Sequence, residues 1–232
     1  MKNVAQALAA IQESIRAAER EFGRAPGSVS LLAVSKGHPA DAIRAAADCG
    51  QRDFGENYLQ EALAKMAQAG RPDLRWHFIG RIQSNKTRDV AAHFDWVHSV
   101  DRLRIASRLS EARPQGKPPL DVLIQVNIDD QPTKAGIPPE ELPELAAGVA
   151  ALPGLRLRGL MAMPAPATDL EAQRRPFRAL RECFERLRAQ GFELDTLSMG
   201  TTADLRAAVA EGATMVRVGT GVFGPRPQKP GT

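Results

Sequence analysis

Lys36 stands at the end of an apolar run, where its amine could act as a nucleophile. The run SVSLLAVSK, residues 28–36, is bounded by Gly27 on one side and by Gly37 and Pro39 on the other, which predicts a core strand of a parallel sheet. The ends of such strands carry the chemistry of many α/β proteins. Apolar neighbours disfavour a charged amine, so Lys36 is a candidate for Schiff-base formation with a carbonyl. The alternative is a lysine whose ammonium group reaches solvent.

Two short turns late in the chain could bind an anion. Residues 198–202 (SMGTT) join a predicted strand to a helix, and residues 219–221 (GTG) follow the last predicted strand. Backbone N–H groups at a helix start, together with hydroxyls, suit a phosphate group. The candidate phosphate contacts are Ser198, Met199, Gly200, Gly219 and Thr220. The alternative is structural, because a hydroxyl can cap a helix and a glycine allows a tight turn.

A reactive lysine beside a phosphate site is what pyridoxal 5'-phosphate (PLP) requires, since its aldehyde condenses with an amine and its phosphate needs donors. Arg217, near the end of the last predicted strand, extends this hypothesis. A cation facing the pyridine nitrogen keeps that nitrogen unprotonated and makes the ring a weak electron sink. A salt bridge to an acid such as Glu56 is the alternative for Arg217.

Strand-like runs alternate with helical patterns along the whole chain. After a first helix at about 2–23, strands are expected at 29–34, 52–54, 75–79, 95–98, 120–127, 155–161, 195–198 and 214–218, and the helices between them at about 39–48, 57–69, 84–92, 101–112, 138–150, 169–190 and 202–211. Strict alternation predicts a parallel sheet covered by helices, and eight units predict a closed (β/α)8 TIM-type barrel. An open doubly wound sheet is the alternative, but neither a GxGxxG motif nor a P-loop follows any of these strands.

The expected organisation is a single barrel domain with an extra N-terminal helix over residues 1–224, no second domain, and a flexible C-terminal tail over 225–232. In such a barrel, polar residues at the carboxyl ends of the strands face one mouth. The residues expected there are Lys36, Asn57, His77, Ser99, Asn127, Ser198 and Arg217.

Composition excludes several classes of protein. The net charge of +4 is spread over helices that also carry acids, with only 5% aromatic residues, so nucleic-acid binding is not expected. The four histidines lack metal-ligand spacing, and Cys49 and Cys183 are too isolated to indicate a disulfide framework. No apolar run approaches the roughly 20 residues of a membrane span, and the N-terminus lacks a signal-peptide pattern. A cytoplasmic protein without metal or membrane contact is expected.

Several motifs, in chain order, closely resemble the pyridoxal phosphate homeostasis protein family. They include AVSK at 33–36, FGENYLQE at 54–61, WHFIG at 76–80, LSMG at 197–200 and MVRVGT at 215–220, and the resemblance runs from about residue 5 to residue 226. It implies a barrel like the N-terminal domain of alanine racemase. It also implies a set of PLP contacts: Lys36 as the anchor, Ser198, Gly219 and Thr220 at the phosphate, Arg217 near the pyridine nitrogen, and Asn57 and His77 along the ring.

The resemblance implies a non-catalytic PLP-binding protein that buffers or delivers this vitamin B6 cofactor. A racemase needs two bases, and the lysine supplies one. In alanine racemases the second is a tyrosine of an additional β-domain, whereas the only tyrosine here is Tyr58. A monomer is expected, with PLP-dependent apo-enzymes as candidate transient partners. A small fold-type III PLP enzyme with amino-acid racemase activity is the main alternative, and a barrel aldolase that uses Lys36 is a second one.

Overall fold

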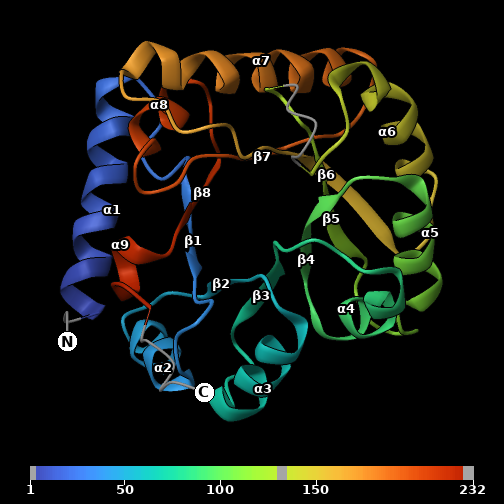
Figure 1. Ribbon diagram of the computed structural model, residues 1–232, viewed down its shortest axis with the longest axis horizontal. Coiled ribbons are helices and arrows are strands. Elements are labelled where there is room, and N and C mark those ends of the chain that lie inside the picture. The colour runs from blue at the N-terminus through green and yellow to red at the C-terminus, as the bar shows by residue number, and fades with distance from the viewer. Residues whose placement is uncertain (1–3, 130–134, 227–232) are drawn as a thin grey trace.

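The computed structural model describes residues 4–129 and 135–226. Its strands form a closed, all-parallel barrel in which each strand pairs with its neighbours in chain order (Figure 1). They are β1 (Ser30–Val34), β2 (Asp53–Glu56), β3 (Arg75–Phe78), β4 (Trp96–Val100), β5 (Leu120–Gln125), β6 (Leu155–Met161), β7 (Thr196–Ser198) and β8 (Met215–Val218). β8 pairs with β1 and so closes the barrel, which confirms the predicted fold class.

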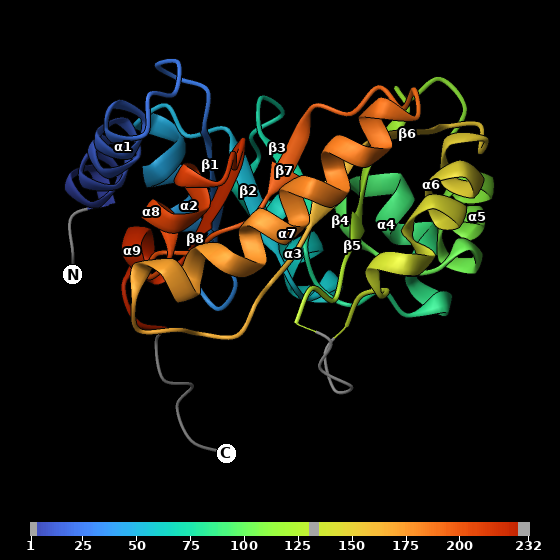
Figure 2. The same cartoon turned by 90° about the horizontal axis from the view of Figure 1, so that it is seen from above.

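The helices surround the barrel, as the end-on and side views show (Figures 1 and 2). They are α1 (Val4–Glu21), α2 (Ala40–Asp48), α3 (Leu59–Ala69), α4 (Thr87–His93), α5 (Leu103–Ala112), α6 (Leu142–Ala150), α7 (Leu170–Ala189), α8 (Leu205–Ala210) and α9 (Thr220–Phe223). Short 3-10 turns at Ser84–Lys86 and Pro139–Glu141 precede α4 and α6. The sequence did not predict α9, because one helical turn shows no periodicity.

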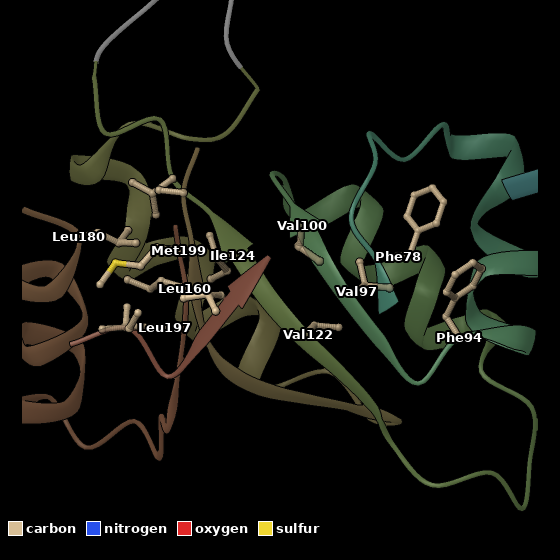
Figure 3. Close-up of a cluster of buried hydrophobic side chains, with 14 of the residues drawn as sticks. Phe78, Phe94, Val97, Val100, Val122, Ile124, Leu160, Leu180, Leu197 and Met199 are labelled. Atoms are coloured by element: carbon tan, nitrogen blue, oxygen red, sulfur yellow. The ribbon is translucent and has the colours of Figure 1, made fainter. Parts of the chain in front are cut away.

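The main hydrophobic core lies between the strands and the helices. Val97, Val122, Ile124 and Leu160 of the strands are buried in this layer, together with Leu180 of α7 (Figure 3). Successive side chains of a strand point to opposite faces, so the alternate positions face into the barrel. A small apolar group inside the barrel, separate from the main core, consists of Trp96, Leu123 and Met161. The remaining interior positions include charged and polar side chains, which belong to the site described below.

The predicted tail at 225–232 falls mostly outside the described residues, which end at Arg226. Among the helices of the described chain, none is both long and apolar enough to cross a membrane. Both cysteines are free thiols. Within residues 4–129 and 135–226, no group of His, Cys, Asp or Glu side chains is arranged to hold a metal ion.

Glu211, which directly follows α8, links that helix to α7. Its carboxylate accepts hydrogen bonds from Arg174 Nε at 2.7 Å, Arg178 Nη2 at 3.2 Å and Arg181 Nη2 at 3.1 Å. The three arginines lie three or four residues apart and therefore share one face of α7. The Glu211 side chain is only 2% exposed, so its charge is compensated by these partners rather than by water.

Replacing Glu211 should destabilise the barrel. We expect Glu211→Ala to lower the free energy of unfolding by about 2 to 4 kcal/mol, because three crowded guanidinium groups lose a buried partner. Urea unfolding followed by circular dichroism measures this loss. Glu185→Ala is the control, since its exposed contact with Arg181 at 3.5 Å should contribute less than about 1 kcal/mol. An equal loss of unfolding free energy in the two variants would contradict the stabilising role of the buried Glu211 carboxylate.

Candidate functional site

A cavity of about 360 Å³ opens at the mouth formed by the carboxyl ends of the strands. It brings together five of the residues predicted from the sequence, namely Lys36, Asn57, Arg217, Gly219 and Thr220. A larger hollow of about 890 Å³ lies beside β6 and the end of α7, but none of the described residues that line it is a lysine, cysteine or histidine. The cavity that contains Lys36 is the candidate functional site, because it also gathers four other predicted residues.

Lys36 follows β1 and is half-buried in the wall of this cavity. Burial lowers the pKa of its amine, and the positive charges of Arg226 and Arg217 lower it further, while Glu56 opposes them. A lower pKa leaves a larger fraction of the amine neutral and nucleophilic at a given pH. The nucleophile expected from the sequence thus has a physical basis in its surroundings.

Two charged side chains of α3 hold the backbone on either side of Lys36. Lys65 Nζ donates to the Ser35 carbonyl at 2.7 Å, and Glu61 accepts from the Gly37 N–H at 2.5 Å. Lys65 and Glu61 also pair with each other at 2.6 Å, as residues four apart on a helix can. These contacts with α3 therefore fix the backbone around Lys36, and with it the direction in which the Lys36 side chain leaves the strand.

Glu56, at the end of β2, completes this group of charges. Its Oε1 accepts from Lys65 Nζ at 2.7 Å and from Ser35 Oγ at 2.6 Å. Burial raises the pKa of the Glu56 carboxyl despite these donors, and its Oε2 is buried with no partner in the part of the chain that the structure describes. Glu56 thus pairs with Lys65 and not with Arg217, so the salt bridge considered for Arg217 is not formed.

Arg217 lies at the base of the cavity and is only 4% exposed. Its Nη1 donates to the Ser198 carbonyl at 2.5 Å and to Ser198 Oγ at 2.8 Å, and its Nη2 donates to the Ala162 carbonyl at 2.8 Å. Burial lowers the pKa of the guanidinium to about 10, which still leaves it charged at neutral pH. These acceptors leave other N–H groups of Arg217 available to a ligand in the cavity.

Asn57 offers a polar group that the protein does not satisfy. Its Oδ1 is buried and has no hydrogen-bond partner among the described residues. The backbone at Asn57 packs so closely on Gly80 that any Cβ at Gly80 would collide with the Asn57 carbonyl. A buried amide oxygen without a hydrogen bond is costly, so the position of Asn57 indicates a ligand with a hydrogen-bond donor, or a bridging water, beside it.

The opposite side of the cavity carries hydroxyl and N–H groups. Thr202, Gly219 and Thr220 line it, and the first N–H groups of α9 have no acceptor within that helix. The backbone N–H and hydroxyl of Thr201 are already bonded to Asp204 Oδ1, at 2.5 and 2.8 Å. An anionic group in this corner would therefore be held by Thr202, Gly219 and Thr220.

Ser198, Met199 and Gly200 were predicted to contact phosphate but do not line this cavity. Ser198 is fully buried, with its hydroxyl between Arg217 and His98. The N–H of Met199 donates to the Met215 carbonyl, and its side chain lies in the main core (Figure 3). A Cβ at Gly200 would collide with Ala208, and the Gly200 carbonyl accepts from the Arg217 N–H. This turn supports the backbone of the site, and a direct phosphate contact from it stays a prediction.

His77 was predicted to lie along the cofactor ring, but the structure places it elsewhere. Its ring is fully buried inside the barrel and borders a second cavity, lined by residues from the amino ends of the strands. Its nitrogens bond to Asp53 and His98. The pleat explains this position, because His77 is an interior residue two positions after the start of β3 at Arg75.

Three contributors to the site were not anticipated from the sequence. Lys65 and Glu61 gave a local signal, their spacing of four residues on a predicted helix. Arg226, by contrast, lies in a segment expected to be a flexible tail, yet it lines the cavity and occupies the space that a Cβ at Gly37 would need. No periodicity or motif predicts such a contact.

The cavity fits PLP by the chemistry of its donors. A lysine amine with a lowered pKa suits an aldehyde, and Thr202, Gly219 and Thr220 suit a phosphate. Arg217 supplies a cation, and Asn57 supplies an amide with unused hydrogen-bonding capacity.

Comparison with known proteins gives a consistent result. The profile of the alanine racemase N-terminal domain family matches residues 7–227. A pyridoxal phosphate homeostasis protein of Pseudomonas aeruginosa is 56% identical over 226 residues, covering 97% of each chain. One of Escherichia coli is 52% identical over 229 residues, covering 97% of this chain and 98% of its own.

Solved structures agree with this relationship. PipY of Synechococcus elongatus, solved with PLP bound, superposes with a TM-score of 0.84 at 39% identity, covering 95% of this chain and 100% of its own. An alanine racemase of Clostridium difficile shares the fold at 16% identity, with a TM-score of 0.76, covering 99% of this chain and 58% of its own. The chain therefore belongs to the alanine racemase N-terminal domain family and, within it, to the pyridoxal phosphate homeostasis proteins.

Proposed function

We propose that this protein binds PLP as a Schiff base on Lys36 and acts in PLP homeostasis, buffering or delivering the cofactor without catalysing a reaction of its own. The observation that carries the proposal is a lysine of lowered pKa in the same cavity as a buried arginine. The homeostasis proteins that are 52 and 56% identical, and the PLP bound to PipY, support it.

Lys36 provides the covalent anchor in this proposal. PLP, when bound, supplies an aldehyde that condenses with an amine. Lys36 would supply the neutral amine for this condensation, in which the two amine protons and the aldehyde oxygen leave as water. Lys65 and Glu61 keep the adjoining backbone in place, while Thr202, Gly219 and Thr220 would hold the phosphate.

Arg217 and Tyr58 explain why binding is proposed rather than catalysis. The Arg217 cation disfavours protonation of a pyridine nitrogen beside it, which makes the ring a weak electron sink. Tyr58, the only tyrosine of the chain, is 61% exposed and does not line the cavity. It is therefore poorly placed to act as the second base that a racemase needs.

Substituting Lys36 tests the anchor. We expect the wild-type protein with PLP to show the absorbance band of a protein-bound Schiff base, and borohydride reduction to leave a stable adduct that peptide mass spectrometry maps to Lys36. Lys36→Ala should lose this band. Lys86→Ala, at a lysine outside the cavity, should retain it. A wild-type adduct that maps to another lysine would contradict the proposed anchor.

Substituting Arg226 tests the control of the Lys36 pKa. Because the Arg226 charge lowers this pKa, Arg226→Gln should raise it and leave less neutral amine at a given pH. The rate of Schiff-base formation, followed by stopped-flow absorbance from about pH 6 to about pH 10, should therefore rise at higher pH than in wild type. Arg81→Gln, at an exposed arginine that has no part in the Lys36 shift, serves as the control. A shift to lower pH in Arg226→Gln would refute the electrostatic argument.

Racemisation of alanine tests the absence of catalysis. We expect PLP-loaded protein to interconvert L- and D-alanine no faster than free PLP, because no tyrosine lines the cavity to act as the second base and the Arg217 cation weakens the ring as an electron sink. Chiral chromatography measures the interconversion. Interconversion that exceeds the free cofactor and disappears in Lys36→Ala would instead favour the racemase alternative. Borohydride trapping by a sugar phosphate but not by PLP would favour the aldolase.

A further inference from the structure

A continuous chain of hydrogen bonds crosses the barrel from one mouth to the other. At the carboxyl ends of the strands it begins at Arg217, which lines the candidate site. At the opposite mouth it ends at Asp53, the first residue of β2, which lines a cavity of about 480 Å³. His98 and Ser198 lie between the two mouths and have no exposed surface.

Every link of this chain has the length of a normal hydrogen bond. Arg217 Nη1 lies 2.8 Å from Ser198 Oγ, and Ser198 Oγ lies 2.9 Å from His98 Nδ1. His98 Nε2 lies 3.0 Å from His77 Nδ1, and His77 Nε2 lies 3.0 Å from Asp53 Oδ1. We call this set the relay; its members are Arg217, Ser198, His98, His77 and Asp53.

The chemistry of its two ends fixes the direction of donation throughout the relay. A guanidinium can only donate, so Ser198 Oγ accepts from Arg217. Of the two groups that Ser198 Oγ contacts among the described residues, only His98 Nδ1 can accept the hydroxyl proton. His98 then carries its proton on Nε2 and donates to His77 Nδ1. His77 likewise carries its proton on Nε2 and donates to Asp53. Both histidines are neutral in this arrangement, and every donor has an acceptor.

The opposite direction fails at both ends. It would require either a protonated Asp53 or a doubly protonated His77. Hydrogen bonds from His77 and Arg75 outweigh burial and lower the pKa of Asp53 to about 2, and burial lowers the pKa of His77. The opposite direction would also leave the Ser198 hydroxyl proton with no acceptor on Arg217. Burial lowers the pKa of both His77 and His98, which agrees with neutral rings.

Neighbouring groups hold the ring of His77 in place. Its ring stacks on Trp96 with centroids 5.4 Å apart and planes 10° apart. Arg158 lies over the same indole, 4.7 Å from its centroid. Asp53 is oriented in turn by two hydrogen bonds of 2.6 Å from Arg75. The side chains at the Asp53 end of the relay are therefore held in one orientation, as the Arg217 side chain is at the other end.

We propose that Asp53, His77 and His98 are positioning residues for cofactor binding, which act through Ser198 to hold Arg217 against the cavity. The Asp53 carboxylate, at the opposite mouth, is the acceptor at the end of a one-way relay. The link to the cofactor rests on the proposed function, whereas the direction of the relay does not. A substitution of Asp53 should therefore alter cofactor binding in the cavity, although Asp53 does not line it.

Histidine NMR on the ligand-free protein tests the direction of the relay. Imidazole ¹⁵N shifts should show His77 and His98 as neutral Nε2–H tautomers from about pH 6 to about pH 9. His98→Asn and His77→Gln assign the signals. Ser198→Ala should release the Nδ1 of His98 and change its shift while the protein stays folded by circular dichroism. An Nδ1–H tautomer or an imidazolium at either ring in wild type would overturn the relay.

Affinity for PLP tests whether the relay reaches the cavity. Asp53→Asn keeps an acceptor oxygen for His77 but removes the charge, and we expect binding about twofold to thirtyfold weaker, with a shifted absorbance band of the bound cofactor. Asp121→Asn is the matched control, because Asp121 lies at the same mouth, has a similar exposure and pairs with Arg156 and Arg158 but with no histidine. It should bind PLP as wild type does.

The outcomes separate this inference from the proposed function. Equal affinities and spectra in Asp53→Asn and wild type would overturn the positioning role, even if the tautomers are as expected. Wild-type protein that binds no PLP would overturn the proposed function, while the ring-nitrogen pattern, measured without cofactor, would still decide the direction of the relay.

Discussion

The site depends on one physical constraint, a guanidinium kept charged inside a closed barrel. Removing the Arg217 charge from water is costly, and the protein compensates with acceptors at the carboxyl ends of β6 and β7. These are the carbonyls of Ser198 and Ala162 and the Ser198 hydroxyl. They lie close enough only because β6, β7 and β8 pair in the observed register. The position of the cation is thus a property of the barrel and not of a local loop.

A second buried group of charges acts on the other side of the cavity in the same way. The Glu56–Lys65 pair is removed from solvent, and its remaining hydrogen bonds go to the backbone and hydroxyl next to Lys36. A buried pair contributes little to stability compared with apolar packing, but its hydrogen bonds specify geometry. Oε1 of Glu56 makes these bonds, whereas its Oε2 has no partner among the described residues. Here the pair fixes the strand end that carries the nucleophile, so the two sides of the cavity are positioned independently.

Sequence reasoning predicted the elements better than the contacts. The runs ending at Val34, Met161 and Val218 were expected as strands because local patterning determines them, and eight alternating units determined the barrel. His77 and His98 gave no signal as partners, since no sequence spacing shows that two rings from neighbouring strands meet. From the sequence, Ser198 was expected at a strand-to-helix turn, where a hydroxyl can cap a helix. Its buried position inside the barrel depends on the pleat of the strand and on closure of the barrel. Such contacts depend on the register between neighbouring strands, which a single sequence does not reveal.

The polar interior of the barrel also bears on function. Buried polar networks in proteins often contribute no more stability than well-packed apolar side chains, so stability alone does not account for this chain of polar groups. In the described residues no carboxylate contacts the Arg217 guanidinium, and Asp204, whose charge raises the Arg217 pKa, is bonded to Thr201 instead. A carboxylate in direct contact would cancel most of the field of the cation within a few ångströms. Ser198 and the Ala162 carbonyl instead accept the hydrogen bonds of Arg217, and the neutral histidines that lead to Asp53 support Ser198 from behind. The positive charge of Arg217 is thereby left directed at the cavity, where a pyridine nitrogen would meet it.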